Sequence, residues 1–502
     1  MAAGRRHVAL VVFVCGIATL GAEIAAARLL APWFGASTII WANTIATVLV
    51  ALSIGYWVGG RLADRDPTTA GLARVVLLGA VLVGAVPFVA GPFLRVSVDA
   101  LDSVDAGAAV GSLLAVLVLI AAPILVLGCV TPWALRLSVD ALDSTGRVSG
   151  RLSAIGTAGA LVGTFTSALL LIPFAGTRRT FLIYALALAL VAAPVLRRRA
   201  PGIVVALLLA VAIVLPAGTV KAGGGRVLWE SETAYQYARA VEHPDGTRVL
   251  ELNEGLAIHS LLPADRSVLT GGYWDEALAL PAAVLGRMPR SVAILGGAAG
   301  TVARAYGALS PQTRVDLVEI DGALPEAGRR LFDLGGPRLH VHIADARPWL
   351  NRTGRRFELI FVDAYRQPYI PFYLATREFF ALARKRLAPG GALVINVGHP
   401  AASDALERTL TATLRAEFPH VARDPAQREN TQLIAAAGPA PSAARLRSAA
   451  GAMPAAVRPL VRAAADRLAP ALAGGEVYTD DRAPVEWLVD GSILAVAAGG
   501  DR

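Results

Sequence analysis

Long apolar runs with few charges fill the first 220 residues of this 502-residue chain, and this feature limits the fold most strongly. A helix needs about 20 apolar residues to cross the hydrocarbon core of a bilayer. About seven segments approach that length, the last two being short, at roughly 8–30, 39–60, 72–94, 107–133, 152–174, 179–196 and 202–219. We therefore expect a transmembrane helical domain over residues 1–222, in a protein that crosses the cell membrane several times and has the lipid bilayer as a partner.

The distribution of arginine orients these spans, because cytoplasmic loops carry an excess of basic residues. With alternating spans, one side receives the larger basic group: Arg5, Arg6, Arg61, Arg65, Arg74, Arg136, Arg147, Arg151 and Arg197 to Arg199. The other side receives Arg28, Arg95, Arg178 and Arg179. Seven crossings place the soluble half outside the cytoplasm. If segment 202–219 only lies against the membrane, or if one span was not recognised, the soluble half is inside the cytoplasm. The sequence does not decide on which side of the membrane the soluble half lies.

The charge pattern argues against a nucleic-acid partner, and the scarcity of metal ligands argues against a metal site. The net charge of +9 comes almost entirely from arginine, and no basic cluster with interleaved aromatic residues occurs, so we expect no nucleic-acid partner. His340 and His342 lie two apart in one apolar run without an acidic third ligand in sequence reach. Both cysteines, Cys15 and Cys129, lie in apolar runs. We therefore expect no metal site.

The soluble half divides into three parts. Residues 226–280 alternate between apolar and polar residues around the turn "HPDGTR", which predicts a small β-rich lead-in. Residues 285–440 are expected to form a Rossmann-like domain that binds an S-adenosyl-type ligand. Residues 441–502 comprise an Ala-rich helical segment and a C-terminal tail, and the tail is expected to dock back on the domain.

Strand-like and helix-like segments alternate within the Rossmann-like part. The expected strands are 291–296, 314–319, 338–343, 357–362 and 391–397, and the expected helices are about 299–308, 322–334, 374–387 and 402–417. This alternation predicts a parallel sheet covered by helices. The fold class is thus a multi-span helical membrane region followed by a soluble α/β domain, of the Rossmann type found in class I S-adenosylmethionine methyltransferases.

Polar residues stand where the first two strands end. The first strand runs into Gly296, Gly297 and Gly300, which permit a tight turn and a close approach of the backbone to a ligand. The second strand ends at Glu319 and Asp321, where a carboxylate can accept hydrogen bonds from ribose hydroxyls. Ligands bind at the carboxyl ends of such strands. These two strand ends therefore favour a nucleoside site.

The third and fourth strands end in the same way. Asp345 follows the third strand, where it could read an adenine amino group, and Asp363 follows the fourth. No lysine follows the glycines, which excludes a P-loop, and "GGAAG" lacks the dinucleotide spacing. An S-adenosyl-type ligand fits the ordered set better than NAD does.

With these motifs, the soluble half resembles the spermidine synthase (polyamine aminopropyltransferase) family, and in particular its bacterial group fused to a multi-span N-terminal region. The resemblance covers about residues 228–400 and rests on "ESETAYQ", "GGYWDEAL", "VEID" and "FVDAYRQPYIPFYLATREFF". It implies the following site residues. Asp363 and Tyr273 are catalytic; Gln236, the three glycines, Glu319, Asp321, Asp345 and Ala346 hold the cofactor; Trp274, Asp275, Tyr365 and Arg366 line the acceptor side.

The chain departs from the family where the family binds its amine. Ala299 stands where the family has an aspartate for the aminopropyl ammonium, and Arg366 stands where a second aspartate grips the diamine. His259 replaces a loop glutamine, and Trp274 replaces a histidine. A cation in place of an anion repels a diammonium substrate, so we expect an acceptor other than plain putrescine, either neutral or anionic.

The expected function is transfer of an aminopropyl or other alkyl group from an S-adenosyl-type sulfonium to an amine or other nucleophile. The cofactor, consumed as a substrate, is decarboxylated S-adenosylmethionine or S-adenosylmethionine itself. One alternative is an S-adenosylmethionine-dependent methyltransferase. Another is a non-enzymatic membrane sensor or transporter-like protein, because "GGRLADRD" at 59–66 resembles a loop of major-facilitator transporters. The sequence leaves open whether a homodimer forms.

Overall fold

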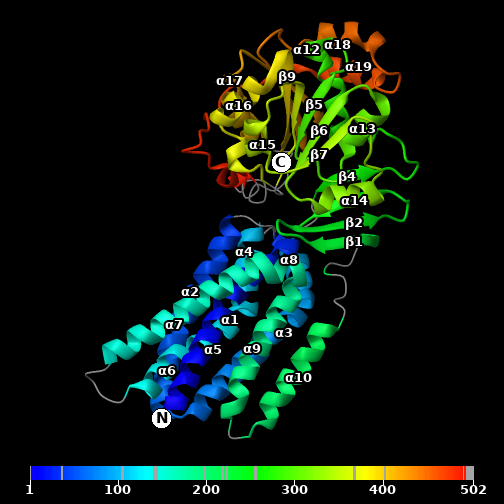
Figure 1. Cartoon of the computed structure of the whole chain (residues 1–502). Coiled ribbons are helices and arrows are strands. Elements are labelled where there is room, and N and C mark those ends of the chain that lie inside the picture. Colours follow the sequence, from blue (N-terminus) through cyan, green and yellow to red (C-terminus); the bar gives the residue numbers. More distant parts are fainter. Residues whose placement is uncertain are drawn as a thin grey trace. The chain divides into compact units, whose positions relative to one another are not determined.

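The computed structural model describes residues 2–34, 38–102, 107–139, 145–196, 198–215, 220, 224–253, 257–365, 369–400, 403–489 and 491–492. These residues form two compact units. The first comprises Met1–Ala222 with Glu232–Tyr237, and the second comprises Gly223–Ser231 with Ala238–Arg502. Figure 1 shows the helical unit and the α/β unit.

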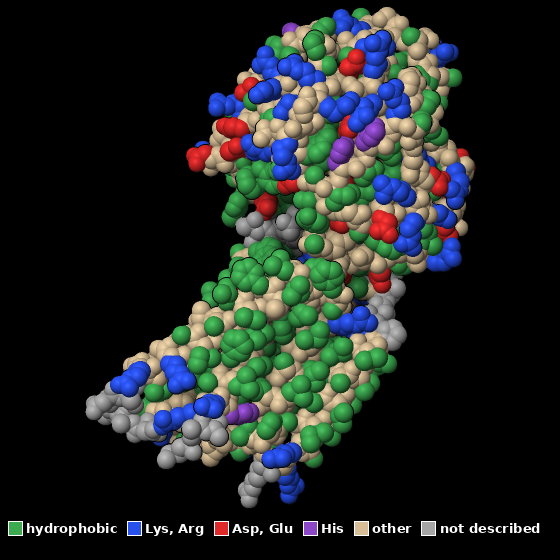
Figure 2. All heavy atoms as spheres, viewed as in Figure 1, with side chains coloured by type: hydrophobic (Ala, Val, Ile, Leu, Met, Phe, Trp, Pro, Cys, Tyr) green, Lys and Arg blue, Asp and Glu red, His purple; other side chains and the backbone are tan. Residues whose placement is uncertain are grey.

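The first unit is a bundle of apolar helices. Its elements are α1 (Ala2–Phe34), α2 (Thr38–Arg65), α3 (Thr69–Asp102), α4 (Gly107–Leu119), α5 (Ala121–Gly128), α6 (Val130–Ser138), α7 (Thr145–Thr166), η2 (Ser167–Leu171), α8 (Ile172–Ala175), α9 (Thr177–Ala192), η3 (Ala193–Val195) and α10 (Ala200–Val214). Within the described residues, six helical stretches are long and apolar enough to cross a membrane, and α10 is apolar but shorter. Hydrophobic side chains cover much of the face of this bundle that is visible in Figure 2.

Small residues bring α1 and α7 into backbone contact. A Cβ added to Gly159 would lie 2.1 Å from the carbonyl oxygen of Phe13, and one added to Gly163 would lie 2.2 Å from that of Ile17. Any larger residue would push the helices apart. The glycine-rich face of α7 is thus a helix-packing face of the kind found between membrane helices.

The last helix of the bundle, α10, runs antiparallel to α9. Arg178 and Arg179, at the start of α9, donate to the carbonyl oxygens of Ala212 and Ile213 near the end of α10. The chain therefore returns to the end of the bundle where α9 begins. Basic side chains gather at the opposite end, which holds the N-terminus (Figures 1 and 2).

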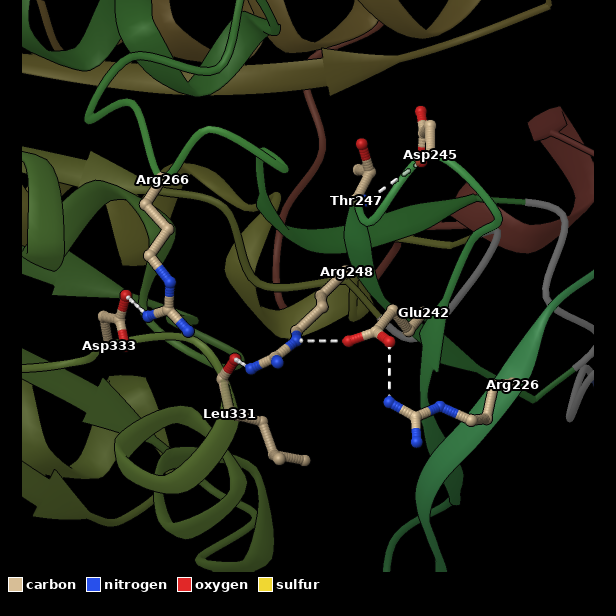
Figure 3. A network of polar contacts seen from close by, with 8 residues as sticks. All are labelled: Arg226, Glu242, Asp245, Thr247, Arg248, Arg266, Leu331 and Asp333. Carbon is tan, nitrogen blue, oxygen red and sulfur yellow. Dashed lines mark hydrogen bonds and ion pairs between the residues drawn. The ribbon is translucent and has the colours of Figure 1, made fainter.

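The second unit begins with a four-stranded sheet of order β1-β2-β3-β4, formed by β1 (Arg226–Glu232), β2 (Tyr237–Glu242), β3 (Arg248–Leu252) and β4 (Ile258–Leu262). Figure 3 shows how charged residues attach this sheet to its neighbours. Glu242 accepts from Arg226 and Arg248, at 2.7 and 3.0 Å, and Arg248 also donates to the carbonyl oxygen of Leu331. These contacts connect the sheet to the C-terminal end of α14 (Ala323–Leu331).

The larger sheet has the order β12-β10-β11-β9-β8-β5-β6-β7. Its strands are β5 (Ser291–Leu295), β6 (Arg314–Glu319), β7 (Leu339–Ile343), β8 (Phe357–Val362), β9 (Leu387–Gly398), β10 (His420–Gln427), β11 (Asn430–Ala436) and β12 (Ala469–Pro470). The strands from β7 to β9 pair in parallel, whereas β11 pairs antiparallel with β9 and β10 pairs antiparallel with β11. The predicted fold class is confirmed, with a mixed rather than wholly parallel sheet.

Helices pack on both faces of this sheet (Figure 1). They are α11 (Glu276–Ala279), α12 (Ala282–Leu285), α13 (Thr301–Leu309), α14 (Ala323–Leu331), α15 (Ala346–Arg352), α16 (Arg377–Arg386), α17 (Ala405–Arg415), α18 (Ala443–Ala449) and α19 (Arg458–Arg467), with the short turns η4 (Tyr273–Asp275), η5 (Phe372–Leu374) and η6 (Ala450–Ala452). Two apolar cores form, one on each face, around Ile294 and Phe361 on one side and Ile360 and Leu393 on the other. They hold the strands rigid behind their carboxyl ends.

The C-terminal tail docks on the α/β unit, as the sequence predicts. Asp480 forms a two-point ion pair with Arg347 at 2.7 and 2.6 Å and accepts from the hydroxyl of Thr376 at 2.7 Å. Tyr478 and Val485 are buried in the core that lies under α16. The tail therefore completes one face of the domain.

Candidate active site

The four predicted strand ends lie at one edge of the sheet. The order β8-β5-β6-β7 makes these strands neighbours, and backbone bonds continue beyond them: Asp363 N donates to Leu295 O, Gly296 N to Val318 O, and Ala344 N to Glu319 O. The glycine turn and the carboxylates that follow these strands therefore lie along the same edge of the sheet, and their roles stay predictions. This is the edge where ligands bind in such sheets.

The glycine turn is attached directly to Glu319. One carboxylate oxygen of Glu319 accepts from the backbone N–H groups of Gly297 and Ala298, at 3.1 and 2.9 Å, and the other accepts from Asp321 N at 3.0 Å. Burial raises the pKa of Glu319, and the three N–H donors oppose that shift. Oε2 already accepts two hydrogen bonds, whereas Oε1 accepts one and can accept a further bond from a ligand hydroxyl.

Packing explains why the turn needs glycine. Gly296 has φ +83°, and a Cβ there would lie 2.4 Å from Ala364 Cα. A Cβ on Gly297 would lie 1.9 Å from Leu317 Cδ1, and one on Gly300 would lie 2.3 Å from a methyl carbon of Leu334. Protein atoms surround all three positions. Close packing against protein atoms is thus a second reason for glycine at these positions. The prediction that the glycines let the backbone approach a ligand stays a prediction.

Asp345 caps the helix that follows β7. Its carboxylate accepts from Arg347 N at 3.0 Å, at the start of α15, and from the hydroxyl of Tyr373 at 3.0 Å. Ala346 is the buried first residue of α15. Tyr373 lies in η5, 28 residues further along the chain, and is not among the residues predicted from the sequence. A hollow of about 660 Å³ lies beside Asp345 and Tyr373.

Among the carboxyls at this edge, Asp363 has the pKa that is shifted furthest from its ordinary value. Its Oδ2 accepts from the Tyr273 hydroxyl at 3.2 Å, and its Oδ1 accepts from Asn396 Nδ2 at 2.9 Å. Burial raises the pKa of Asp363 to about 7, against the opposing effect of these two donors. A carboxyl that titrates near neutral pH can both take and return a proton, which is what a general base requires.

Aromatic residues surround Asp363. The rings of Tyr273 and Trp274 lie 4.5 Å apart between centroids. The hydroxyl of Tyr365 donates to the carbonyl oxygen of Asn396 at 2.9 Å and accepts from Gly398 N at 2.6 Å. Burial, reinforced by the neighbouring Asp363, raises the pKa of Tyr273 well above its ordinary value, so Tyr273 stays protonated and acts as a donor.

Asp275 has a different set of partners. It is buried, and its carboxylate accepts from Thr270 N, from the Thr270 hydroxyl and from Gly271 N, the last at 2.8 Å. These bonds hold the loop that precedes η4, whose first residue is Tyr273. In this structure Asp275 therefore supports the loop, and its predicted place on the acceptor side stays a prediction.

Four other residues named from the sequence are Arg366, Gln236, Ala299 and His259. Arg366 lies outside the described residues, and Gln236 is buried in the segment that clusters with the helical unit, so their roles stay predictions. Ala299 is fully buried and donates its N–H to the Ser260 hydroxyl at 3.0 Å. His259 Nε2 is buried without a hydrogen-bond partner among the described residues.

Two buried amides were not predicted at all. Asn396 on β9 contacts Asp363, and Gln432 on β11 donates to Asn396 Oδ1 at 2.7 Å. A polar residue in the apolar run "ALVINVG" was the only sequence signal for Asn396. In the part of the chain that the structure describes, no group of three or more His, Cys, Asp and Glu side chains could hold a metal ion.

Comparison with known proteins supports the resemblance. Residues 274–425 match the family model of the spermine/spermidine synthase domain. A "Probable polyamine aminopropyl transferase" of Bifidobacterium longum is 33% identical over 203 residues, which cover 38% of this chain and 44% of the relative. A "Polyamine aminopropyltransferase" of Vibrio vulnificus is 34% identical over 112 residues, which cover 22% of this chain and 38% of the relative. The chain therefore spans less than half the length of these curated relatives.

A solved structure is similar to part of the chain. The crystal structure of a probable spermidine synthase from Corynebacterium glutamicum has 21% sequence identity and a TM-score of 0.39, covering 52% of this chain and all of that chain. This similarity carries no argument about function. The match of residues 274–425 to the spermine/spermidine synthase domain and the curated relatives confirm the family resemblance inferred from the sequence motifs.

Proposed function

We propose, from the spermine/spermidine synthase domain that this chain carries over residues 274–425, that the protein is a membrane-bound alkyl transferase. Its donor would be an S-adenosyl-type sulfonium, and the group transferred would be aminopropyl. The observation that carries the proposal is the position of Asp363, which shares one sheet edge with Glu319 and the glycine turn. The apolar helices support attachment to a membrane.

Asp363 would act as the general base. The acceptor nitrogen attacks the carbon bound to the sulfonium, the new C–N bond forms, and the C–S electron pair returns to sulfur, which leaves as a neutral thioether. The nitrogen loses a proton, and Asp363 Oδ2 accepts it. The hydroxyl of Tyr273, 3.2 Å from that oxygen, would orient the incoming nitrogen. Holding both reactants in line supplies most of the acceleration, because the sulfonium carbon is already electrophilic.

The acceptor would be a neutral or anionic molecule with a single reacting amine. Ala299, where the resemblance implies an aspartate, is buried against Ser260. The carboxylate of Asp275 is engaged by its own loop. The described side chains that hydrogen-bond Asp363 are Asn396 and Tyr273, neither of which is a carboxylate that would hold the far ammonium of a diamine, and this supports an acceptor other than putrescine.

Substitution of Asp363 with asparagine tests the role of this carboxyl. Mass spectrometry of nucleosides retained by the purified protein would first identify the donor, and an acceptor screen would follow. We expect Asp363→Asn to lower kcat by at least about 100-fold, because a general base contributes that much, while the donor Kd changes little. Asp466→Asn is the matched control, because Asp466 is exposed and forms an ion pair with Arg447. This variant should keep the wild-type rate. A wild-type rate in Asp363→Asn would exclude this role.

A methyltransferase is the second candidate. Loss of the ammonium-binding aspartate at Ala299 removes one reason to prefer the decarboxylated donor, which lacks the carboxylate of S-adenosylmethionine. Calorimetry with the two donors separates the candidates. At least tenfold tighter binding of the decarboxylated form favours aminopropyl transfer, and the opposite order favours methyl transfer.

A further inference from the structure

Two amide side chains lie opposite each other behind Asp363. Asn396 and Gln432 are directly paired in the antiparallel register of β9 and β11. Their exposed fractions are 2% and 0%, and each is followed or preceded along its strand by buried apolar residues, Val394, Ile395 and Val397 in β9 and Leu433 and Ile434 in β11. A buried amide destabilises a fold unless it is hydrogen-bonded. Their presence at this position therefore calls for a function that apolar residues could not serve.

The hydrogen bonds between them run in one direction. Gln432 Nε2 donates to Asn396 Oδ1 at 2.7 Å, and Asn396 Nδ2 donates to Asp363 Oδ1 at 2.9 Å. The bond from Gln432 holds the oxygen of Asn396 away from Asp363, so the NH₂ group of Asn396 faces the carboxyl. The far amide thus sets which group the near amide presents to the carboxyl.

The backbone of Asn396 is held as well. The Tyr365 hydroxyl donates to its carbonyl oxygen at 2.9 Å and accepts from Gly398 N at 2.6 Å. Tyr365 follows Asp363 by two residues, so this bond connects the loop that carries Asp363 to the strand that carries Asn396. Side chain and main chain of Asn396 both restrain the same loop.

We propose that Asn396 and Gln432 are positioning residues for Asp363. The relay Gln432–Asn396 fixes Oδ1 and leaves Oδ2, which faces Tyr273, as the oxygen that accepts the proton. This inference rests on the proposed function, in which Asp363 is the base. An NH₂ donor at Oδ1 also favours the ionised carboxyl, so the relay keeps part of the carboxyl population ready to accept a proton near neutral pH.

Among the described residues, two other ionisable groups act on this carboxyl. Within the described residues, the titratable groups that act on Asp363 are Tyr273 from η4 and Tyr365 from its own loop. Both tyrosines have a pKa raised by burial, so they stay neutral across the range in which Asp363 titrates. The donor from Asn396 is therefore the group whose removal should move the Asp363 titration most.

Infrared titration of the full-length protein in detergent tests the relay without any substrate. The carboxyl band of Asp363 is identified by difference against Asp363→Asn. We expect Asn396→Leu to raise the titration midpoint by about one pH unit, the effect of losing a charge-assisted hydrogen bond. Gln432→Leu should raise it by less. The double variant should match Asn396→Leu alone, because both residues act through one contact.

The controls separate a relay from general loosening of the core. Thr411→Val removes another buried polar group, on α17, and should leave the midpoint unchanged. Gln432→Leu remains informative if Asn396→Leu fails to fold, because its side chain does not touch Asp363. An unchanged midpoint in Gln432→Leu, or additive shifts in the double variant, would overturn the proposal. Because no acceptor is needed, absence of product from the wild-type protein would count against the proposed function alone.

Once an acceptor is found, kinetics provide a second readout. Asn396→Leu should move the acid limb of kcat/KM to higher pH by the same amount and lower kcat by about tenfold, with the donor KM unchanged. A change confined to the donor KM would assign Asn396 to ligand binding and overturn the positioning role.

Discussion

At the scale of single residues, burial of Asp363 links its ionisation to folding. Burial raises its pKa from 3.8 to about 7 in the folded protein, while the unfolded chain keeps the ordinary value. Between these two values the unfolded state releases its proton and the folded state retains it. The free energy of unfolding therefore falls as pH rises through this window and levels off above it.

We expect Asp363→Asn to remove this component of the pH dependence. The variant should gain stability relative to the wild type as pH rises from about 4 to about 7, because asparagine does not ionise. Thermal unfolding midpoints of both proteins across this range provide the measurement. A constant difference between the two midpoints would show that Asp363 titrates alike in both states.

Gly297 tests the packing explanation for the glycine turn. Gly297→Ala should destabilise the α/β unit by about 1–3 kcal/mol, because its Cβ would lie 1.9 Å from Leu317 Cδ1 in a buried core. Gly335→Ala is the control, since nothing lies within 4 Å of a Cβ there. Chemical denaturation measures both. Equal stability of the two variants would mean that the core adjusts freely around Leu317.

The residues that the sequence revealed differ in kind from those that it concealed. Asp363 and Glu319 follow strands directly, so their convergence depends only on strand order. Asn396, Gln432 and Tyr373 reach the site through the register of β9 with β11 and through the path of η5, which no local pattern encodes. The sequence also could not show that the carboxylate of Asp275 turns toward its own loop.

At the scale of elements, the parallel strands were predictable because each is a short apolar run that ends in a polar turn. The expected ranges 314–319 and 357–362 coincide with β6 and β8. The antiparallel pair β10 and β11 was missed. Its first strand, "HVARDPAQ", includes charged residues and Pro425, and proline weakens a strand assignment. Tertiary pairing with β9 stabilises a hairpin that local preference does not favour.

The docked tail gives a prediction about one element. Asp480→Ala removes the ion pair with Arg347 and the bond to Thr376, so the tail should open more often and be cleaved faster by a protease. The loss in global stability should stay near 1 kcal/mol, because the pair is partly exposed. Asp481→Ala, one residue further on, is the control. Mass spectrometry of the fragments locates the cleavage, and equal rates for both variants would contradict the prediction.

At the scale of the whole molecule, the direction of α10 bears on membrane topology. The structure returns the chain to the end of the bundle that carries Arg178 and Arg179, opposite the end that is rich in arginine. If the arginine-rich end is cytoplasmic, as the distribution of basic residues predicts, residues after α10 emerge on the other side. We therefore expect the α/β unit outside the cytoplasm.

Reporter fusions in bacteria test this topology. Alkaline phosphatase joined after residue 222 should be active, because it requires export, and green fluorescent protein at the same place should be dark. Fusions after residue 198, before α10, should show the reverse pattern. Fluorescence at both positions would mean that α10 does not cross the membrane.

The glycine contact between α1 and α7 has a consequence for biosynthesis. If these helices span a bilayer, α1 is inserted before α7, the helix that it packs against, has been translated. At about 5–20 residues per second, the roughly 130 residues between the ends of these helices take on the order of ten seconds to make. During that interval the surface of α1 that later contacts α7 faces lipid or the insertion machinery. Packing of α1 in the bundle therefore waits for the synthesis of α7.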